Sequence, residues 1–220
     1  MNVIVFASYK GGSGKSTLAA RLAAQVHRRL RSILLIDADV QGSLTRWHKM
    51  RGSGEPPLCT ATEAVADLIK TAGLWGYEWV FIDTPPNMSA VVTDAIRAAT
   101  LVVIPVRLTV FDMVALMKTM NLCRKLGKPY AVVVNGVEVT NTEWPSVGEA
   151  RQVLTRLSVP VWPGQITQRT SYSLAEGAGA EEYDSNSEAG AEVAALWNAI
   201  EKSVKAIHGA YESIAMHRVA

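Results

Sequence analysis

The sequence predicts a three-layer, doubly wound α/β fold with a mostly parallel central sheet. Five continuous apolar runs recur along the 220 residues, and helix-like stretches separate them. Continuous apolar runs, unlike alternating ones, are typical of strands that are buried on both faces of a parallel sheet. A glycine-rich loop follows the first run, and polar residues follow several others. Ligands of such folds bind beyond the carboxyl ends of the strands, so these loops predict where a functional site lies.

The expected strands are short and are joined through single helices. The strands are expected at residues 3–7, 33–36, 79–82, 101–104 and 130–134, with a possible sixth at 159–162. The helices are expected at residues 15–30, 61–71, 89–99, 110–125, 146–157 and 190–214. The most loop-like segments are residues 51–57 and 178–186. Because no repeat or linker divides the chain, residues 1–220 are expected to form a single domain.

The composition is that of a compact globular protein. Hydrophobic residues make up 49% of the chain and charged residues 19%, which argues against a disordered chain. The net charge of +2 neither requires nor excludes nucleic acid, so any DNA binding would need a local patch. Cys59 and Cys123 show no metal or redox spacing. No leader precedes the first apolar run and no run reaches the ~18 residues of a membrane span, so a cytoplasmic protein is expected.

Residues 9–17 read Tyr-Lys-Gly-Gly-Ser-Gly-Lys-Ser-Thr and lie between an expected strand and an expected helix. Strand, glycine-rich turn and helix form the context of a phosphate-binding loop. The glycines let backbone N–H groups converge on phosphate oxygens, and the helix N-terminus adds partial positive charge. Lys15 can reach the β- and γ-phosphates, and the Ser16 hydroxyl can hold Mg²⁺. The expected nucleotide-binding residues of this loop are Gly11, Gly12, Ser13, Gly14, Lys15, Ser16 and Thr17.

The loop departs from the usual G-x-x-x-x-G-K-[ST] pattern, because Tyr9 stands at the first glycine position and Lys10 precedes the remaining glycines. In this it resembles the deviant Walker A motif, K-G-G-x-x-K-[ST], of the ParA/MinD family of P-loop ATPases. The resemblance implies ATP and Mg²⁺ as ligands. It also implies that Lys10 acts across a nucleotide-sandwich homodimer, on the phosphates of the partner. It covers most of the chain, from Val3 to about Ile200, and its best-matched motifs lie in the first 90 residues.

Aspartates follow the second and third expected strands. The first pair, Asp37 and Asp39, lies in a segment similar to the family's D-x-D-P-Q-G-[SN], with Val40 in place of the proline. By this resemblance Asp39 orients the attacking water and Asp37 supports the local network, although either could instead cap the next helix. Asp83 ends the third strand and precedes Thr-Pro-Pro, as in the family's Walker B segment. Asp83 is therefore expected to hold Mg²⁺, usually through a water.

Three further polar residues follow later strands. Asn135 resembles the family's adenine-reading asparagine, because its amide offers the donor and acceptor that the adenine edge requires; a turn before Gly136 is the alternative. Arg107 lies in a partial match to a family segment, and is either a loop charge or an interface contact. Arg169 is expected with equal weight to contact nucleotide, a dimer partner or DNA, or to form a surface ion pair.

The resemblance implies a ParA-like, Mg²⁺-dependent dimerising ATPase that positions or segregates a cargo, either a plasmid or a protein assembly. In its ATP state it would bind DNA non-specifically and so associate with the nucleoid. Hydrolysis would be slow alone, since no arginine is evidently placed as a finger, and a ParB-like or cargo-adaptor protein would stimulate it. The candidate DNA contacts are scattered along the chain: Arg151, Arg156, Arg169, Lys202 and Lys205.

Two alternatives are weighed against this interpretation. A MinD-like, membrane-associated regulator needs an amphipathic C-terminal helix with a basic face. The apolar face of Trp197, Ile200, Val204 and Ile207 has few cations opposite it, so no stable membrane association is expected. A biosynthetic P-loop enzyme of the dethiobiotin-synthetase or amidoligase type generally lacks an equivalent of Lys10.

Overall fold

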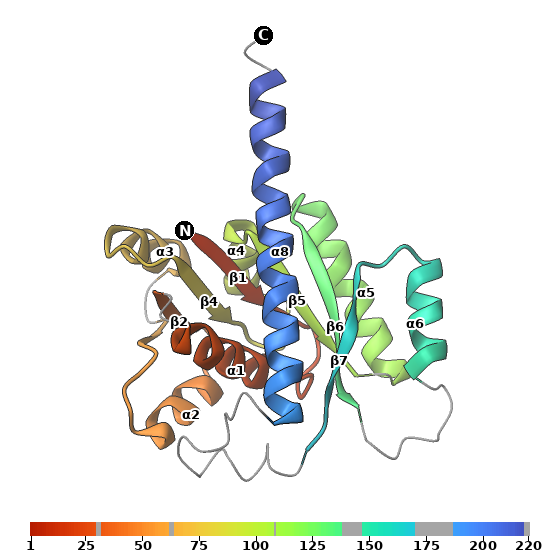
Figure 1. Cartoon of the computed structure of the whole chain (residues 1–220), viewed down its shortest axis with the longest axis horizontal. Helices are drawn as coiled ribbons and strands as arrows, with labels where there is room; N and C mark the ends of the chain where they lie inside the picture. The colour runs from red at the N-terminus through yellow and green to blue at the C-terminus, as the bar shows by residue number, and fades with distance from the viewer. Residues whose placement is uncertain (30–31, 62–63, 108, 138–146, 170–186, 218–220) are drawn as a thin grey trace.

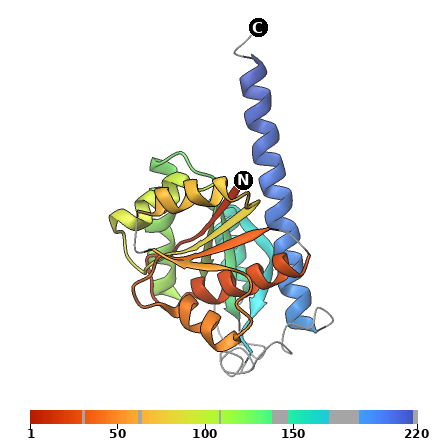
Figure 2. The ribbon, with the colours of Figure 1, turned by 90° about the vertical axis from the view of Figure 1, so that its left-hand side faces the viewer.

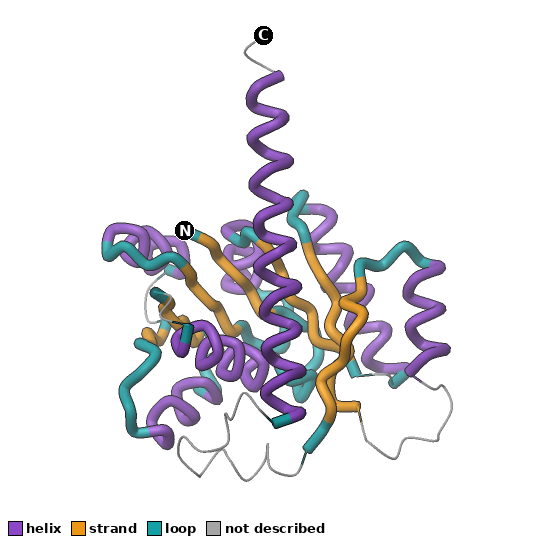
Figure 3. The backbone as a smooth tube through the Cα atoms, in the orientation of Figure 1, coloured by secondary structure: helices purple, strands orange, loops and turns teal. Residues whose placement is uncertain are grey.

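The computed structural model describes residues 1–29, 32–61, 64–107, 109–137, 147–169 and 187–217. At its centre is a seven-stranded sheet in the order β3-β2-β4-β1-β5-β6-β7, and every neighbouring pair is parallel. Figure 3 shows this sheet between two layers of helices. The strands are β1 (Asn2–Phe6), β2 (Ile33–Asp37), β3 (Leu58–Thr60), β4 (Trp79–Asp83), β5 (Leu101–Val106), β6 (Tyr130–Val137) and β7 (Val161–Thr167).

The helices cover both faces of the sheet and confirm the three-layer arrangement. One layer contains α1 (Lys15–Arg28), α2 (Ser43–Arg51) and α8 (Glu188–His217). The other contains α3 (Val65–Leu74), α4 (Ala90–Ala98), α5 (Val110–Lys125) and α6 (Val147–Arg156). Side chains alternate along β1, so Ile4 and Phe6 pack on the first layer while Val3 and Val5 pack on the second. This double burial is why the strands read as continuous apolar runs.

The structure confirms the five expected strands and places the possible sixth at β7. Two elements were not expected. The helix α2 has only Leu44 and Trp47 as buried apolar residues among many cations, so its periodicity is weak. The strand β3 has three residues and lies at the edge of the sheet, too short to give a sequence pattern. The loop expected at residues 178–186 lies outside the described residues.

The helix α8 is 30 residues long and extends past the edge of the sheet at which the strands begin (Figures 1 and 2). Its first half packs on the sheet, where the rings of Trp197 and Trp79 lie 4.7 Å apart between centroids. At the sheet edge, a ring nitrogen of His208 lies 2.8 Å from Asn2 Oδ1. Among the helices of the described residues, none combines the length and apolar character that crossing a bilayer requires.

Candidate nucleotide-binding site

The phosphate-binding loop connects β1 directly to α1, as the sequence predicts. Gly12 and Gly14 have φ angles of 71° and 94°, which other residues rarely adopt. Asn135 Nδ2, from β6, donates a hydrogen bond of 2.7 Å to the Ser13 carbonyl. A Cβ atom at Gly14 would lie only 2.0 Å from the same nitrogen. The glycine is therefore needed both for the turn and for the close approach of Asn135.

Neighbouring elements hold the start of this loop in place. The Thr84 hydroxyl, which follows β4, donates to the Phe6 carbonyl at 2.8 Å. The backbone N–H of Tyr9 donates to the Thr119 hydroxyl on α5 at 3.1 Å, and the Lys118 ammonium lies 4.2 Å from the centre of the Tyr9 ring. Tyr9, which replaces the usual first glycine, therefore docks the loop on α5.

Charged side chains meet behind the loop. Lys15 and Asp83 are 6% and 0% exposed. Burial lowers the pKa of Lys15, against the opposing charges of Asp83 and Asp39. Burial also raises the pKa of Asp83 to about 7, against the Ser16 hydroxyl and the Lys15 ammonium, which lower it. Neither carboxylate oxygen of Asp83 makes a hydrogen bond within the described residues. The site thus contains a buried carboxylate, that of Asp83, whose oxygens are free to bind a ligand.

This donor set fits Mg²⁺ bound together with a nucleotide. Mg²⁺ uses one or two protein ligands, together with waters and phosphate oxygens, more often than an all-protein cage. Asp83 offers two unsatisfied oxygens next to Ser16, and both residues border the phosphate-binding loop. In the described part of the chain, no three His, Cys, Asp or Glu side chains gather into a metal site. Ser16 and Asp83 would therefore hold the ion only in company with phosphates.

The two aspartates after β2 have different surroundings. Asp37 is buried, and its Oδ2 accepts hydrogen bonds from the Thr45 backbone N–H at 2.8 Å and the Thr45 hydroxyl at 2.7 Å. Asp37 therefore caps α2, which is the structural alternative that the sequence left open. Asp39 is half-buried, accepts from the Gln41 N–H at 3.0 Å, and acts electrostatically on Lys15. Of the two, Asp39 is the one whose charge acts on Lys15 of the phosphate-binding loop.

Lys10 has a partner that the sequence analysis missed. Its Nζ lies 3.0 Å from Asp112 Oδ1, where Asp112 is 2% exposed and the Lys10 side chain 39% exposed. The other oxygen of Asp112 accepts a short hydrogen bond from the Thr109 hydroxyl, and Thr109 caps the N-terminus of α5. The spacing of Thr109 and Asp112 is that of a helix N-terminus with a capping side chain, which is the signal that could have drawn attention to Asp112.

Several predicted DNA or interface cations have partners within the chain. Arg151 donates to the Trp162 carbonyl at 2.7 Å and to the Gly164 carbonyl. Arg169 pairs with Glu188 and Glu192, and Lys205 lies 3.6 Å from Glu201. Arg107 lies against the backbone of Gly136. The structure thus favours the ion-pair alternative for Arg169.

Comparison with known proteins gives the family. The model of the CobQ/CobB/MinD/ParA nucleotide binding domain matches residues 4–181. The chain is 31% identical over 173 residues to the maintenance of carboxysome distribution protein A of Gloeobacter kilaueensis, covering 74% of this chain and 76% of that protein.

Two solved structures share the fold. MinD in the MinC:MinD complex of Aquifex aeolicus has a TM-score of 0.75 at 19% identity, over 92% of this chain and 96% of that chain. A plasmid partition protein of Borrelia burgdorferi, described as bound to AMPPNP, has a TM-score of 0.69 at 20% identity, over 92% of this chain and 99% of that chain. The matched domain includes the phosphate-binding loop, Asp83 and Asn135, and the chain therefore belongs to the CobQ/CobB/MinD/ParA family of nucleotide-binding domains.

Proposed function

We propose that the protein is a Mg²⁺-dependent ATPase that dimerises with ATP and, in that state, holds DNA non-specifically while it positions or segregates a cargo. The observation that carries this proposal is the loop itself. Lys15 is buried beside Asp83 and Asp39, while a second lysine, Lys10, stays 39% exposed at the mouth of the same loop. One buried lysine suffices for phosphate binding, so the second can make a contact outside its own site once it leaves its ion pair with Asp112.

The proposal gives a role to each residue of the site. The N–H groups of residues 11–17 and the Lys15 ammonium bind the phosphates. Asn135 holds the loop through its hydrogen bond to Ser13, and its side-chain amide hydrogen-bonds the edge of the adenine ring. A Mg²⁺ ion, when bound, neutralises charge that develops on the phosphates. Asp39 orients the attacking water. Arg169 is engaged by Glu188 and Glu192, which fits slow hydrolysis that a partner protein accelerates.

The cargo is proposed from the relatives. One relative is named for the distribution of carboxysomes and one structural neighbour for plasmid partition. Both names describe placing a large object within a cell. For this chain we therefore infer a plasmid or a protein assembly as cargo, a ParB-like or adaptor protein as activator, and association with the nucleoid through DNA.

ATP turnover separates this proposal from a biosynthetic enzyme with the same fold. We expect low turnover by the protein alone, and stimulation by DNA together with the product of a neighbouring gene that encodes a candidate activator. Lys15→Ala should abolish both basal and stimulated turnover. Turnover that requires a small carboxylic acid or amine as co-substrate, and ignores DNA, would instead support a dethiobiotin-synthetase or amidoligase type of activity.

A further inference from the structure

Positive charge is concentrated in one part of the chain. Between Lys15 and Arg51 the sequence contains eight lysines and arginines but only two acids, a net charge of +6. The whole chain carries +2, so the remaining residues together carry −4. An anionic partner would therefore be attracted to this segment and repelled by much of the rest of the molecule.

The acids of this segment do not neutralise its surface. Neither α1 nor α2 contains an acidic residue. Asp37 is buried and caps α2, and Asp39 is half-buried and interacts with Lys15. The outward faces of both helices thus carry cations, with no acid from either helix between them.

The cations of α2 share one face. Leu44 and Trp47 are buried against the core, at 0% and 8% exposure. Arg46 and Lys49 are exposed and lie three residues apart, so they are neighbours on the opposite face. The guanidinium of Arg46 also donates to the Gln41 carbonyl at 3.0 Å, which orients it beside the Asp39 loop.

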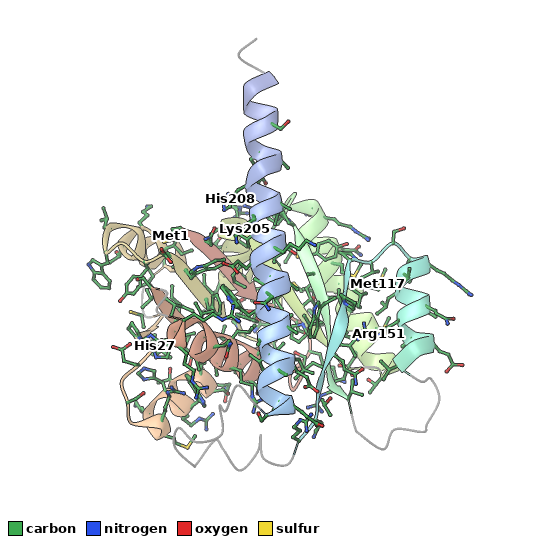
Figure 4. All side chains as sticks on the ribbon, in the orientation of Figure 1. Met1, His27, Met117, Arg151, Lys205 and His208 are labelled. Atoms are coloured by element: carbon green, nitrogen blue, oxygen red, sulfur yellow. The ribbon has the colours of Figure 1, made fainter. Side chains whose placement is uncertain are left out.

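The end of α1 adds two exposed cations to the same layer of helices. Arg28 and Arg29 are exposed, and Arg29 Nη1 donates to Asn198 Oδ1 of α8 at 2.9 Å. The helices α1 and α2 lie side by side in one layer (Figure 2). His27, labelled at the end of α1 in Figure 4, lies 3.9 Å from Glu55 in the loop that follows α2. The helices α1 and α2 are therefore neighbours, and the Arg29 guanidinium lies on the side of α1 that faces α8.

Helix electrostatics explain only part of this arrangement. Cations in a last turn interact favourably with the helix dipole, which accounts for Arg28 on α1 and for Lys49 on α2. Arg46, however, is the fourth residue of α2, near the positive end of the helix, where a cation gains nothing from the dipole. The absence of any acid from both helices is likewise unexplained by the dipole, because an acid would be favourable in their first turns.

We propose that Arg28, Arg29, Arg46 and Lys49 form a surface, the α1–α2 basic surface, that binds the phosphate backbone of DNA. The proposal rests on the DNA binding of the proposed function and names where it takes place. Three of the four cations are arginines, whose planar forks match phosphate oxygens. Both helices begin at loops of the candidate nucleotide site, α1 at Lys15 and α2 after the Asp39 loop, while Arg28 and Arg29 lie at the opposite end of α1.

Salt-dependent binding of a short DNA duplex tests the surface. With a slowly hydrolysed ATP analogue, Arg46→Gln/Lys49→Gln should lower affinity about 60-fold per engaged subunit near 0.1 M salt, because two phosphate contacts are lost. The slope of log affinity against log salt should fall by about 1.8. ATP affinity should be unchanged, which shows that the variant is folded. Lys49→Glu alone should also weaken binding, without disturbing the contact of Arg46 with Gln41.

The matched control removes the same charge from the opposite layer of helices. Lys70→Gln/Lys125→Gln changes exposed lysines of α3 and α5 and should leave affinity and slope unchanged. If the control lost DNA binding while the α2 variant bound DNA fully, the α1–α2 basic surface would not be the DNA-binding site, and the proposed function would still stand. No DNA binding by the wild type in any nucleotide state would overturn both. Charge-dependent binding to phosphatidylserine vesicles without DNA binding would assign the surface to a membrane and contradict the proposal.

Discussion

Lys10 Nζ lies 3.0 Å from Asp112 Oδ1, so the lysine expected to act across a dimer is held by its own chain. Asp112 is almost fully buried and is itself held by Thr109 at the start of α5. The ion pair and the proposed contact with a partner's phosphates therefore compete for one ammonium group. The nucleotide-free protein would keep Lys10 back until ATP offers a stronger anion.

Asp112→Asn should ease ATP-induced dimerisation. Lys10 is more than a third exposed, so the pair is worth only a fraction of a kcal/mol to about 1 kcal/mol, which corresponds to roughly a two- to five-fold gain in dimer affinity. Sedimentation with and without ATP measures this. Lys10→Ala is the opposite variant and should still bind ATP but no longer dimerise. An ATP-induced dimer of Lys10→Ala that equals the wild type would disprove the contact across the dimer.

Lys15→Ala should raise the dissociation constant for ATP about 100-fold, because a buried charge-assisted contact with phosphate is lost. Titration calorimetry measures the affinity, and Lys70→Ala is the control, since Lys70 pairs with Asp67 on the surface of α3. Retained wild-type affinity in Lys15→Ala would contradict the assignment of the phosphate-binding loop.

Asp39→Ala and Asp37→Ala should fail in different ways. Asp39→Ala is expected to bind ATP normally and to hydrolyse it about 100-fold more slowly, leaving a persistent dimer. Asp37→Ala removes the cap of α2 and should lower the free energy of unfolding by about 1–2 kcal/mol. Single-turnover hydrolysis and urea denaturation separate the two effects. Normal turnover in Asp39→Ala would remove this residue from the mechanism.

The stability of the nucleotide-free protein should depend on Asp83. Burial raises its pKa to about 7, from an ordinary value of 3.8, so the folded protein binds more protons than the unfolded chain between these values. Stability therefore falls as pH rises from about 4 to about 7. Asp83→Asn should raise the melting temperature at pH 8, with a gain that shrinks toward pH 4. The control is Asp94→Asn on the surface, and identical pH profiles for Asp83→Asn and wild type would contradict the burial argument.

Asn135→Ala tests whether the amide reads the base. It loses the hydrogen bond to Ser13, so affinity for every nucleotide should fall, by a factor of about five to ten. If Asn135 also contacts adenine, the preference for ATP over GTP should shrink in the same variant. An equal loss for ATP and GTP would leave Asn135 with a structural role only.

The sequence predicted most of the fold because double burial leaves a direct record in the chain. The strands β1, β2, β4, β5 and β6 are apolar on both faces, so each one gives a continuous apolar run in the sequence. The elements that were missed, α2 and β3, bury little apolar surface. In α2 the polar face of Arg46 and Lys49 dominates the pattern, and this concealed both the helix and its concentration of charge.

The site could be predicted where a short motif fixes its geometry. Residues 10–16 and Asp83 meet because a loop and a strand end are neighbours in any parallel sheet of this order. The contacts of Lys10 with Asp112 and of Ser13 with Asn135 join residues far apart in the sequence. No local pattern records such pairs, since they depend on how α5 and β6 pack against the loop.

Duplex DNA binding by the wild-type protein with ADP, ATP and a slowly hydrolysed ATP analogue tests the central claim most directly. The proposed function predicts binding with ATP or the analogue only, weakening steeply between low and high salt. Equal binding with ADP and with the analogue, or none with either, would contradict a nucleotide-gated attachment to DNA.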